Sequence, residues 1–257
     1  AAYILDAANL AVVHALQLPS TSATFSVSLA INAQYAVVGV PFDDFLGPAA
    51  GAVHVYDVAT GALIRTIHGE SPAQFTFGAS VALSGDRLVV GTTSTANRVH
   101  VYDVPTGTLM MTLQAPFSSG NGFGASVAID GDRIAVGHAG SNTGFVHLYD
   151  AATGAFISTI ANPAPAMGDF FGHAIAISGG RLLVGAPGDD AVGEDAGAAY
   201  LFDMATGALL HTFLRGPGAT YANFGAAVGF VPGRLAIGST PASAWGLTNV
   251  VTHWSSQ

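Results

Sequence analysis

Small and apolar residues alternate along five stretches of the chain, each beginning with Phe and ending with Gly fourteen residues later. In two of them, Ser-Val-Ala-Leu and Ser-Val-Ala-Ile repeat with a period of two residues, which predicts strands rather than helices. A short turn follows, as in Asp130-Gly131-Asp132, and then a strongly apolar strand such as Leu182-Leu183-Val184. The stretches are Phe25–Gly39, Phe77–Gly91, Phe123–Gly137, Phe171–Gly185 and Phe224–Gly238. Their spacing of about 50 residues is typical of propeller blades.

Two further strands are predicted after each apolar strand. The third strand reads Val-His-Val-Tyr-Asp at 53–57 and at 99–103, and it leads into Asp-x-x-Thr-Gly, as at Asp57–Gly61. The Asp can accept loop N–H groups and the Gly can adopt positive φ, so this motif predicts a hairpin into a fourth strand, for example Ala62–Ile67.

These patterns predict an all-β fold, a five-bladed β-propeller of four-stranded antiparallel blades. Because the repeat covers almost the whole chain, residues 1–257 are expected to form a single β-propeller domain. The repeats are placed near 25–68, 77–115, 123–161, 171–215 and 224–257.

The two ends of the chain predict how the ring closes. The fifth repeat stops after a third-strand candidate, Val250–Trp254, whereas Tyr3–Asp6 and Leu10–Leu16 resemble a third and a fourth strand. We expect residues 1–17 to provide the closing strand or strands, so that both termini meet in the last blade. One third-strand segment is then left over, as an edge for assembly or as a frayed end.

Composition excludes several classes of protein. Half of the residues are hydrophobic and only 9% are charged, yet no apolar run reaches the length of a membrane helix. The net charge of −9 and the absence of Lys argue against nucleic-acid binding, and the absence of Cys excludes a disulfide scaffold. The Ala-Ala start would suit a chain cleaved after a signal peptide.

A family resemblance rests on the stretch from Phe171 to Asp190, which contains Phe-Gly-His-Ala-Ile-Ala-Ile and then Arg-Leu-Leu-Val-Gly-Ala-Pro-Gly-Asp-Asp. It resembles the FG-GAP repeats of integrin-α-like propellers, above all the compact bacterial version. The resemblance implies an extracellular, cell-surface or periplasmic protein that recognises a partner through its loops.

One feature of that family is missing. Integrin-type repeats carry a calcium loop between the first two strands, whereas this chain has short turns there, such as Ser84-Gly85-Asp86. Calcium needs six to eight oxygen ligands, so we expect no integrin-type calcium site and no cofactor. Calcium bound by a different acidic loop is the alternative.

Histidines form the first candidate chemistry. His54, His100 and His147 occupy the same third-strand position in successive repeats, so they should lie far apart and pack structurally instead of binding one metal. His173 stands where the other repeats have Val or Ala, near Asp169, and such a pair can support acid–base chemistry. Since no nucleophile or second base is evident nearby, a structural role is favoured and no catalytic residue is assigned.

Acidic residues provide the candidate partner-binding site. Half of the sixteen lie in the tight turns at one end of the strands, and the others in longer loops at the opposite end, where function is more often located. The alternative is a structural role, in which each carboxylate accepts hydrogen bonds from the local backbone. The loop set is Asp43, Asp44, Glu70, Asp169, Asp189, Asp190, Glu194 and Asp195.

Three functions compete. The favoured one is a non-enzymatic, extracytoplasmic interaction module that binds a protein or glycan partner through the long-loop face. The second is a structural subunit of a surface assembly or homo-oligomer, because low charge suits a surface that is buried between copies. The third is a polysaccharide-active enzyme with paired loop acids such as Asp44 and Asp190.

Overall fold

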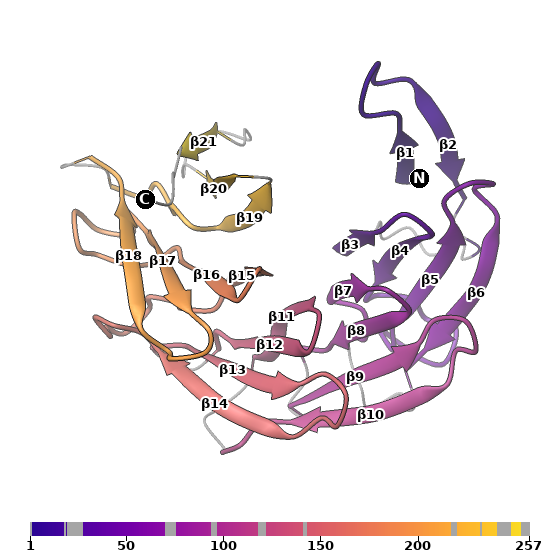
Figure 1. Ribbon diagram of the computed structural model, residues 1–257, viewed down its shortest axis with the longest axis horizontal. Coiled ribbons are helices and arrows are strands. Elements are labelled where there is room, and N and C mark those ends of the chain that lie inside the picture. The colour runs from indigo at the N-terminus through magenta and orange to yellow at the C-terminus, as the bar shows by residue number, and fades with distance from the viewer. Residues whose placement is uncertain are drawn as a thin grey trace. The chain divides into compact units, whose positions relative to one another are not determined.

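The computed structural model describes residues 2–17, 19, 28–69, 76–93, 97–117, 122–140, 143–216, 220–231, 233–240 and 248–252. Within these residues the structure is all-β, with strands, turns and bends and no helix (Figure 1). The chain divides into two compact units, Ala1–Ala115 and Pro116–Gln257, whose boundary falls between the second and third repeats. The single domain over residues 1–257 and the blade count of five stay predictions.

Four repeats form the predicted four-stranded antiparallel sheets, in which consecutive strands are neighbours. In the first unit, one sheet contains β3 (Ser28–Ile31), β4 (Tyr35–Val40), β5 (Ala52–Asp57) and β6 (Leu63–His68). The other contains β7 (Ser80–Ser84), β8 (Arg87–Gly91), β9 (Arg98–Asp103) and β10 (Leu109–Gln114).

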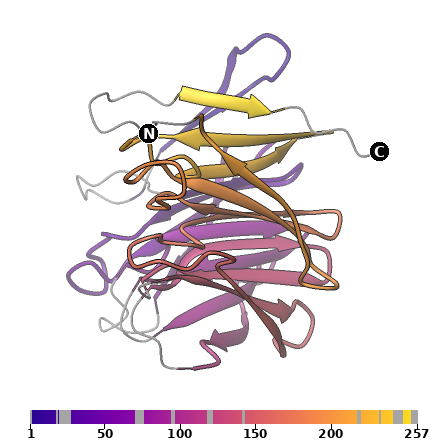
Figure 2. The same ribbon diagram turned by 90° about the vertical axis from the view of Figure 1, so that its left-hand side faces the viewer.

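The second unit repeats this arrangement (Figures 1 and 2). Its first sheet contains β11 (Phe123–Asp130), β12 (Arg133–His138), β13 (Phe145–Asp150) and β14 (Phe156–Ala161). Its second contains β15 (Ala174–Ser178), β16 (Arg181–Ala186), β17 (Ala198–Asp203) and β18 (Leu209–Leu214). The last sheet has three strands, β19 (Ala227–Val231), β20 (Arg234–Ser239) and β21 (Thr248–Thr252), which Figure 2 shows side by side in gold and yellow.

The Phe-Gly pairs join neighbouring sheets within each unit. A Cβ atom on Gly185 would lie 1.9 Å from the carbonyl oxygen of Gly225, so two backbones touch where the second strand of one repeat meets the Phe-Gly of the next. Gly197 and Phe224 form an isolated parallel bridge beside this contact. The same close approach occurs between Gly39 and Gly78 and between Gly137 and Gly172. Only glycine permits this spacing, which is the physical reason for the repeated motif.

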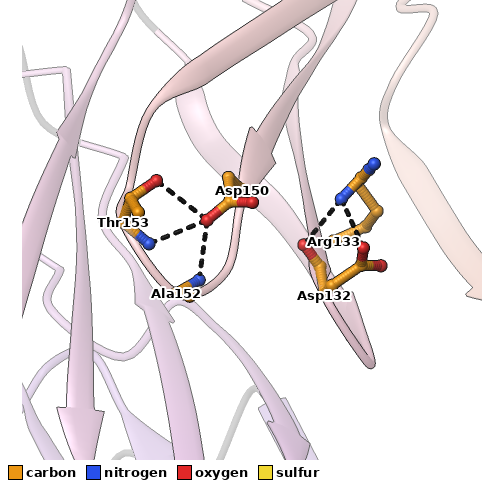
Figure 3. Close-up of polar contacts among 5 residues, drawn as sticks. All are labelled: Asp132, Arg133, Asp150, Ala152 and Thr153. Atoms are coloured by element: carbon orange, nitrogen blue, oxygen red, sulfur yellow. Dashed lines mark hydrogen bonds and ion pairs between the residues drawn. The ribbon is translucent and has the colours of Figure 1, made fainter.

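The Asp-x-x-Thr-Gly turns have the predicted chemistry (Figure 3). The Asp150 carboxylate accepts hydrogen bonds from the N–H groups of Ala152 and Thr153 and from the Thr153 hydroxyl, at 2.8–3.0 Å. Gly154 follows with φ of +71°. These hydrogen bonds favour the ionised carboxylate and lower the pKa of Asp150. Asp57, Asp103 and Asp203 act in the same way.

The N-terminal segment forms a separate hairpin of β1 (Ala2–Leu5) and β2 (Val12–Leu16). Its turn, Asp6–Leu10, has the hydrogen bonds of the Asp-x-x-Thr-Gly turns, and Leu10 has φ of +62° at the Gly position. The hairpin therefore corresponds to a third and fourth strand, as the sequence predicts. Its Ile4 and Leu16 pack against Val38 and Tyr56 of the first repeat. Ring closure through the last blade stays a prediction.

Candidate functional site

Two loops contain six of the predicted site residues and share one backbone frame. Residues 43–51 read Asp-Asp-Phe-Leu-Gly-Pro-Ala-Ala-Gly, and residues 189–197 read Asp-Asp-Ala-Val-Gly-Glu-Asp-Ala-Gly. Each connects the second and third strands of its sheet, in the first and fourth repeats. We call them the first-repeat loop and the fourth-repeat loop. In both, the N–H of the final Gly donates to the carbonyl of the leading Asp at 2.9 Å.

The paired carboxylates of both loops hold this frame together. Asp43 accepts the Phe45 N–H at 3.0 Å, and Asp189 accepts the Ala191 N–H at 2.9 Å. The second acid of each pair spans the loop: Asp44 accepts the Ala49 N–H at 2.7 Å, and Asp190 accepts the Asp195 N–H at 2.8 Å. All four carboxylates therefore hydrogen-bond the backbone of their own loop, as the structural alternative to partner binding expects.

Asp169 holds a third loop, between β14 and β15. Its buried carboxylate accepts hydrogen bonds from the Asn162 side-chain amide at 2.6 Å and from the Ala166 N–H at 2.7 Å. Burial raises the pKa of Asp169, and the nearby charge of Asp189 acts in the same direction. His173 donates its backbone N–H to the Phe170 carbonyl of this loop, and burial lowers the pKa of its side chain.

Asp189 is also anchored to the strand that follows its loop. The Tyr200 hydroxyl donates to the Asp189 carboxylate at 2.5 Å, and both side chains are buried. Burial raises the pKa of Tyr200, and the hydrogen bond to Asp189 adds to this effect. Tyr200 therefore stays protonated and fixes the loop to β17.

The remaining acids are at the surface or outside the described residues. Glu194 is exposed, and its carboxylate accepts a hydrogen bond from the Tyr221 hydroxyl, which raises the pKa of Tyr221. Asp195 is half-buried and has φ of +46°. Glu70 lies outside the described residues, as do the two tryptophans, Trp245 and Trp254.

Each of the three third-strand histidines is bonded within its own sheet. His54 and His147 each pair through Nδ1 with a fourth-strand Thr hydroxyl at 2.9 Å, and His100 pairs with Thr112 at 3.3 Å. Sequence reasoning missed His138, whose Nδ1 lies 3.3 Å from His147 Nε2 in a buried pair. Burial and the neighbouring His138 lower the pKa of His147 to about 4. Within the described residues no group of three or more His, Cys, Asp or Glu side chains could hold a metal ion.

Large apolar side chains project from the same loops, and the sequence reasoning, directed at acids, missed them. Phe45 is 76% exposed in the first-repeat loop, although its ring stacks on His68. In the second unit, Met167 is 80% exposed, Phe170 48% and Tyr221 44%. The signal was present in the sequence, because Phe170 precedes the Phe-Gly pair where other repeats have Thr, Gly or Asn.

The opposite end of the strands offers little by comparison. A shallow pocket of about 260 Å³ is lined by Asp132, Arg133 and Met204, with neighbouring turn residues. Arg133 pairs there with Asp132 at 2.7 Å, as Figure 3 shows, and the Asp130 carboxylate accepts the Gly179 N–H of the next repeat at 2.9 Å. Within each unit, the longer loops are therefore the better candidates for recognition.

Comparison with known proteins supports the fold and one repeat directly. The family model described as "FG-GAP repeat" matches residues 159–202, so the chain contains an FG-GAP repeat where the sequence resemblance is strongest. No curated protein sequence matches the chain.

Three solved structures have similar folds at low sequence identity. A chain in the crystal structure of a mitotic checkpoint complex has a TM-score of 0.61 and 23% identity, covering 98% of this chain and 72% of that one. Hydrazine synthase of Kuenenia stuttgartiensis has a TM-score of 0.64 and 14% identity, covering 95% and 67%. The computationally designed Ika4 protein has a TM-score of 0.50 and 17% identity, covering 74% and 96%. The similarity is to β-propeller-like folds, and at these identities it concerns the fold alone.

Proposed function

We propose that this protein is a non-enzymatic, extracytoplasmic interaction module that binds a protein or glycan partner through its long-loop face. One observation carries the proposal: within the second unit, the loops present Met167, Phe170 and Tyr221 to solvent on a hydrogen-bonded frame. Aromatic residues and Met are enriched at protein interfaces, and binding residues are often on loops positioned by a rigid scaffold. The FG-GAP repeat at 159–202 supports a location outside the cytoplasm.

The carboxylates have a supporting role in this proposal. Asp43, Asp44, Asp169 and Asp189 hold the loops in shape, and the partner is bound by the side chains that the loops present, the exposed Asp190 and Glu194 included. The proposed binding needs no calcium or other cofactor, and EDTA should leave it unchanged.

The test compares the two ends of the strands. Purified protein is applied to a glycan array and to proteins of the source's extracellular fraction, beside a Met167→Ser/Tyr221→Ser variant and an Asp132→Ser/Met204→Ser control at the opposite end of the same unit. We expect the loop-face variant to lose a bound partner that the control retains. Equal binding by both variants would contradict the proposal.

A structural subunit is the second candidate, because the N-terminal hairpin exposes apolar side chains. Leu10 and Val12 are solvent-exposed, and so are Leu29 and Ile31 on the adjacent β3. An apolar pocket of about 160 Å³ lies among β1, β2, β3 and β4. Light scattering at low and high salt tests this function. A salt-resistant multimer would support it, and a monomer would contradict it.

A closed ring of five blades is part of the proposal, with residues 1–17 completing the last blade. It is supported by the five repeats and by the third-and-fourth-strand character of the β1–β2 hairpin. Hydrogen exchange should show loss of protection in β21, the edge strand of the last sheet, when residues 1–17 are deleted. Unchanged protection in β21 would count against closure.

A further inference from the structure

We propose that Met167, Phe170 and Tyr221, with Asp190 and Glu194, form one binding patch for a cationic segment of a protein partner. The inference rests on the proposed function and deepens it, because it names the site and the chemistry of the partner. All five residues belong to the second unit, so the patch is complete within it.

The patch combines exposed apolar side chains with the carboxylates of Asp190 and Glu194, of which Glu194 accepts the Tyr221 hydroxyl. Met167, Phe170 and Tyr221 all leave large parts of their side chains in water. Isolated exposed apolar residues are common, but three on adjoining loops of one unit are typical of an interaction surface.

The three contributing loops are tied together by backbone hydrogen bonds. The Gly188 N–H donates to the Asp169 carbonyl at 3.2 Å, which joins the Met167–Phe170 loop to the fourth-repeat loop. At the other end of that loop, the Tyr221 N–H donates to the Glu194 carbonyl at 2.7 Å. A surface held in this way loses little conformational entropy when a partner binds.

Two of the aromatic residues have a backbone conformation that favours glycine. Phe170 has φ of +53° and Tyr221 has φ of +50°. At the position of Phe170 three other repeats have Thr76, Gly122 and Asn223, all at positive φ, and at the position of Tyr221 the fourth repeat has Gly168, with φ of +92°. A bulky residue with positive φ is strained, so the fold alone does not account for these aromatic side chains.

The charges around the aromatic residues select the partner. Residues 162–171, 187–197 and 220–226 contain no Lys or Arg, whereas Asp190 and Glu194 are exposed among them. The nearest basic residue in sequence is Arg215, just after β18. A guanidinium or ammonium group can contact an aromatic face and a carboxylate at once, so charge complementarity favours a basic segment.

The experiment uses a variant that should lose binding without losing stability. Phe170→Gly/Tyr221→Gly places glycine at both positive-φ positions, so its melting temperature should equal or exceed that of the wild type. The probe is a short synthetic peptide of alternating Arg and Leu, with a Glu-for-Arg peptide as the control, and binding is measured by fluorescence anisotropy at fixed salt.

We expect the wild type to bind the Arg peptide and not the Glu peptide. The glycine double variant should weaken binding roughly tenfold, and Glu194→Gln about threefold, in the range of cation–π and exposed charge contributions. Asp132→Asn, at the opposite end of the strands, should leave binding unchanged.

Two results would overturn the inference in distinguishable ways. If the double variant binds the Arg peptide as tightly as the wild type, the patch is not the site. If the wild type binds a glycan or a neutral peptide in a Phe170-dependent manner and ignores the Arg peptide, the site holds and the partner class is wrong. Binding to no probe, glycan array included, counts against the proposed function itself.

Discussion

The first-repeat loop and the fourth-repeat loop have the same backbone and different surfaces. Both have an Asp pair, a central Gly and a final Gly at positive φ, with matching internal hydrogen bonds. The first loop exposes Phe45, whereas the fourth exposes Asp190 and Glu194 and has Phe170 and Tyr221 in adjoining loops. The comparison separates residues that build the loop from residues that are free to vary for binding.

The two loops also differ in how they are anchored to the next strand. In the fourth repeat Tyr200 bonds Asp189 directly, and in the first repeat His54 takes the place of Tyr200. The shorter imidazole bonds Thr66 through Nδ1, and its buried Nε2 has no hydrogen-bond partner within the described residues. The same carboxylate frame is therefore held more firmly in the fourth repeat.

The largest loss of stability is expected for substitution of the final Gly, which has the same backbone conformation in both loops. Gly51→Ala and Gly197→Ala each place a Cβ 2.2 Å from a Phe carbonyl oxygen in a residue with φ near +80°. Each should lower the free energy of unfolding by about 3 kcal/mol or more, because steric overlap adds to backbone strain. Urea denaturation measures the loss, and Gly216→Ala, with open space around its Cβ position, is the control. A mild effect of either loop substitution would show that its frame is not rigid.

Removing the leading carboxylate should destabilise the protein more in the fourth-repeat loop than in the first-repeat loop. Asp189→Ala leaves the Tyr200 hydroxyl and the Ala191 N–H without their acceptor, and we expect a loss of about 2–4 kcal/mol. Asp43→Ala removes the acceptor of the Phe45 N–H and should cost about 1–2 kcal/mol. Equal losses in urea denaturation would contradict the difference in anchoring.

Lowering the pH should reduce the stability that His54 contributes in the first repeat and leave the contribution of Tyr200 in the fourth repeat unchanged. Burial lowers the pKa of His54, with the charge of Asp43 opposing this, so the folded protein binds a proton less readily than the unfolded chain. The stability that depends on neutral His54 is thus complete at alkaline pH and is lost as pH falls below about 6.5, with a slope of at most about 1.4 kcal/mol per pH unit.

A His54→Tyr variant isolates this contribution. The other histidines are present in both proteins, so the difference between wild type and variant at pH 7.5 and pH 5.5 reports on His54 and its interaction with His68. We expect the wild type to lose more stability on acidification than the variant, measured by urea midpoints. Parallel losses would show that the His54 environment does not disfavour the imidazolium.

The smallest effect concerns a strained position that both loops share. Ala49 has φ of +52° and Asp195 has φ of +46°. Ala49→Gly and Asp195→Gly should each stabilise the protein by about 0.5 kcal/mol, because relief of strain slightly exceeds the entropy cost of glycine. Calorimetry should show a small rise in melting temperature for both. A fall in either would mean that the native side chain makes a contact worth more than the strain.

The sequence determined the repeat, the strand order within each sheet and the chemistry of the turns. Period-two alternation, Asp-x-x-Thr-Gly and the Phe-Gly pairs are local signals, and local geometry translates them directly into hairpins and close backbone contacts. Even the third-and-fourth-strand character of the N-terminal hairpin followed from its similarity to later repeats.

Only the tertiary structure decided what the site residues do. In the sequence Asp43, Asp169 and Asp189 were equivalent to any surface acid, and whether a carboxylate meets solvent or a buried N–H depends on how its loop folds back. The same holds for Phe170 and Tyr221, because exposure and positive φ are properties of the folded loop. Local pattern specifies elements, whereas burial and hydrogen-bond partners depend on residues brought together from different loops.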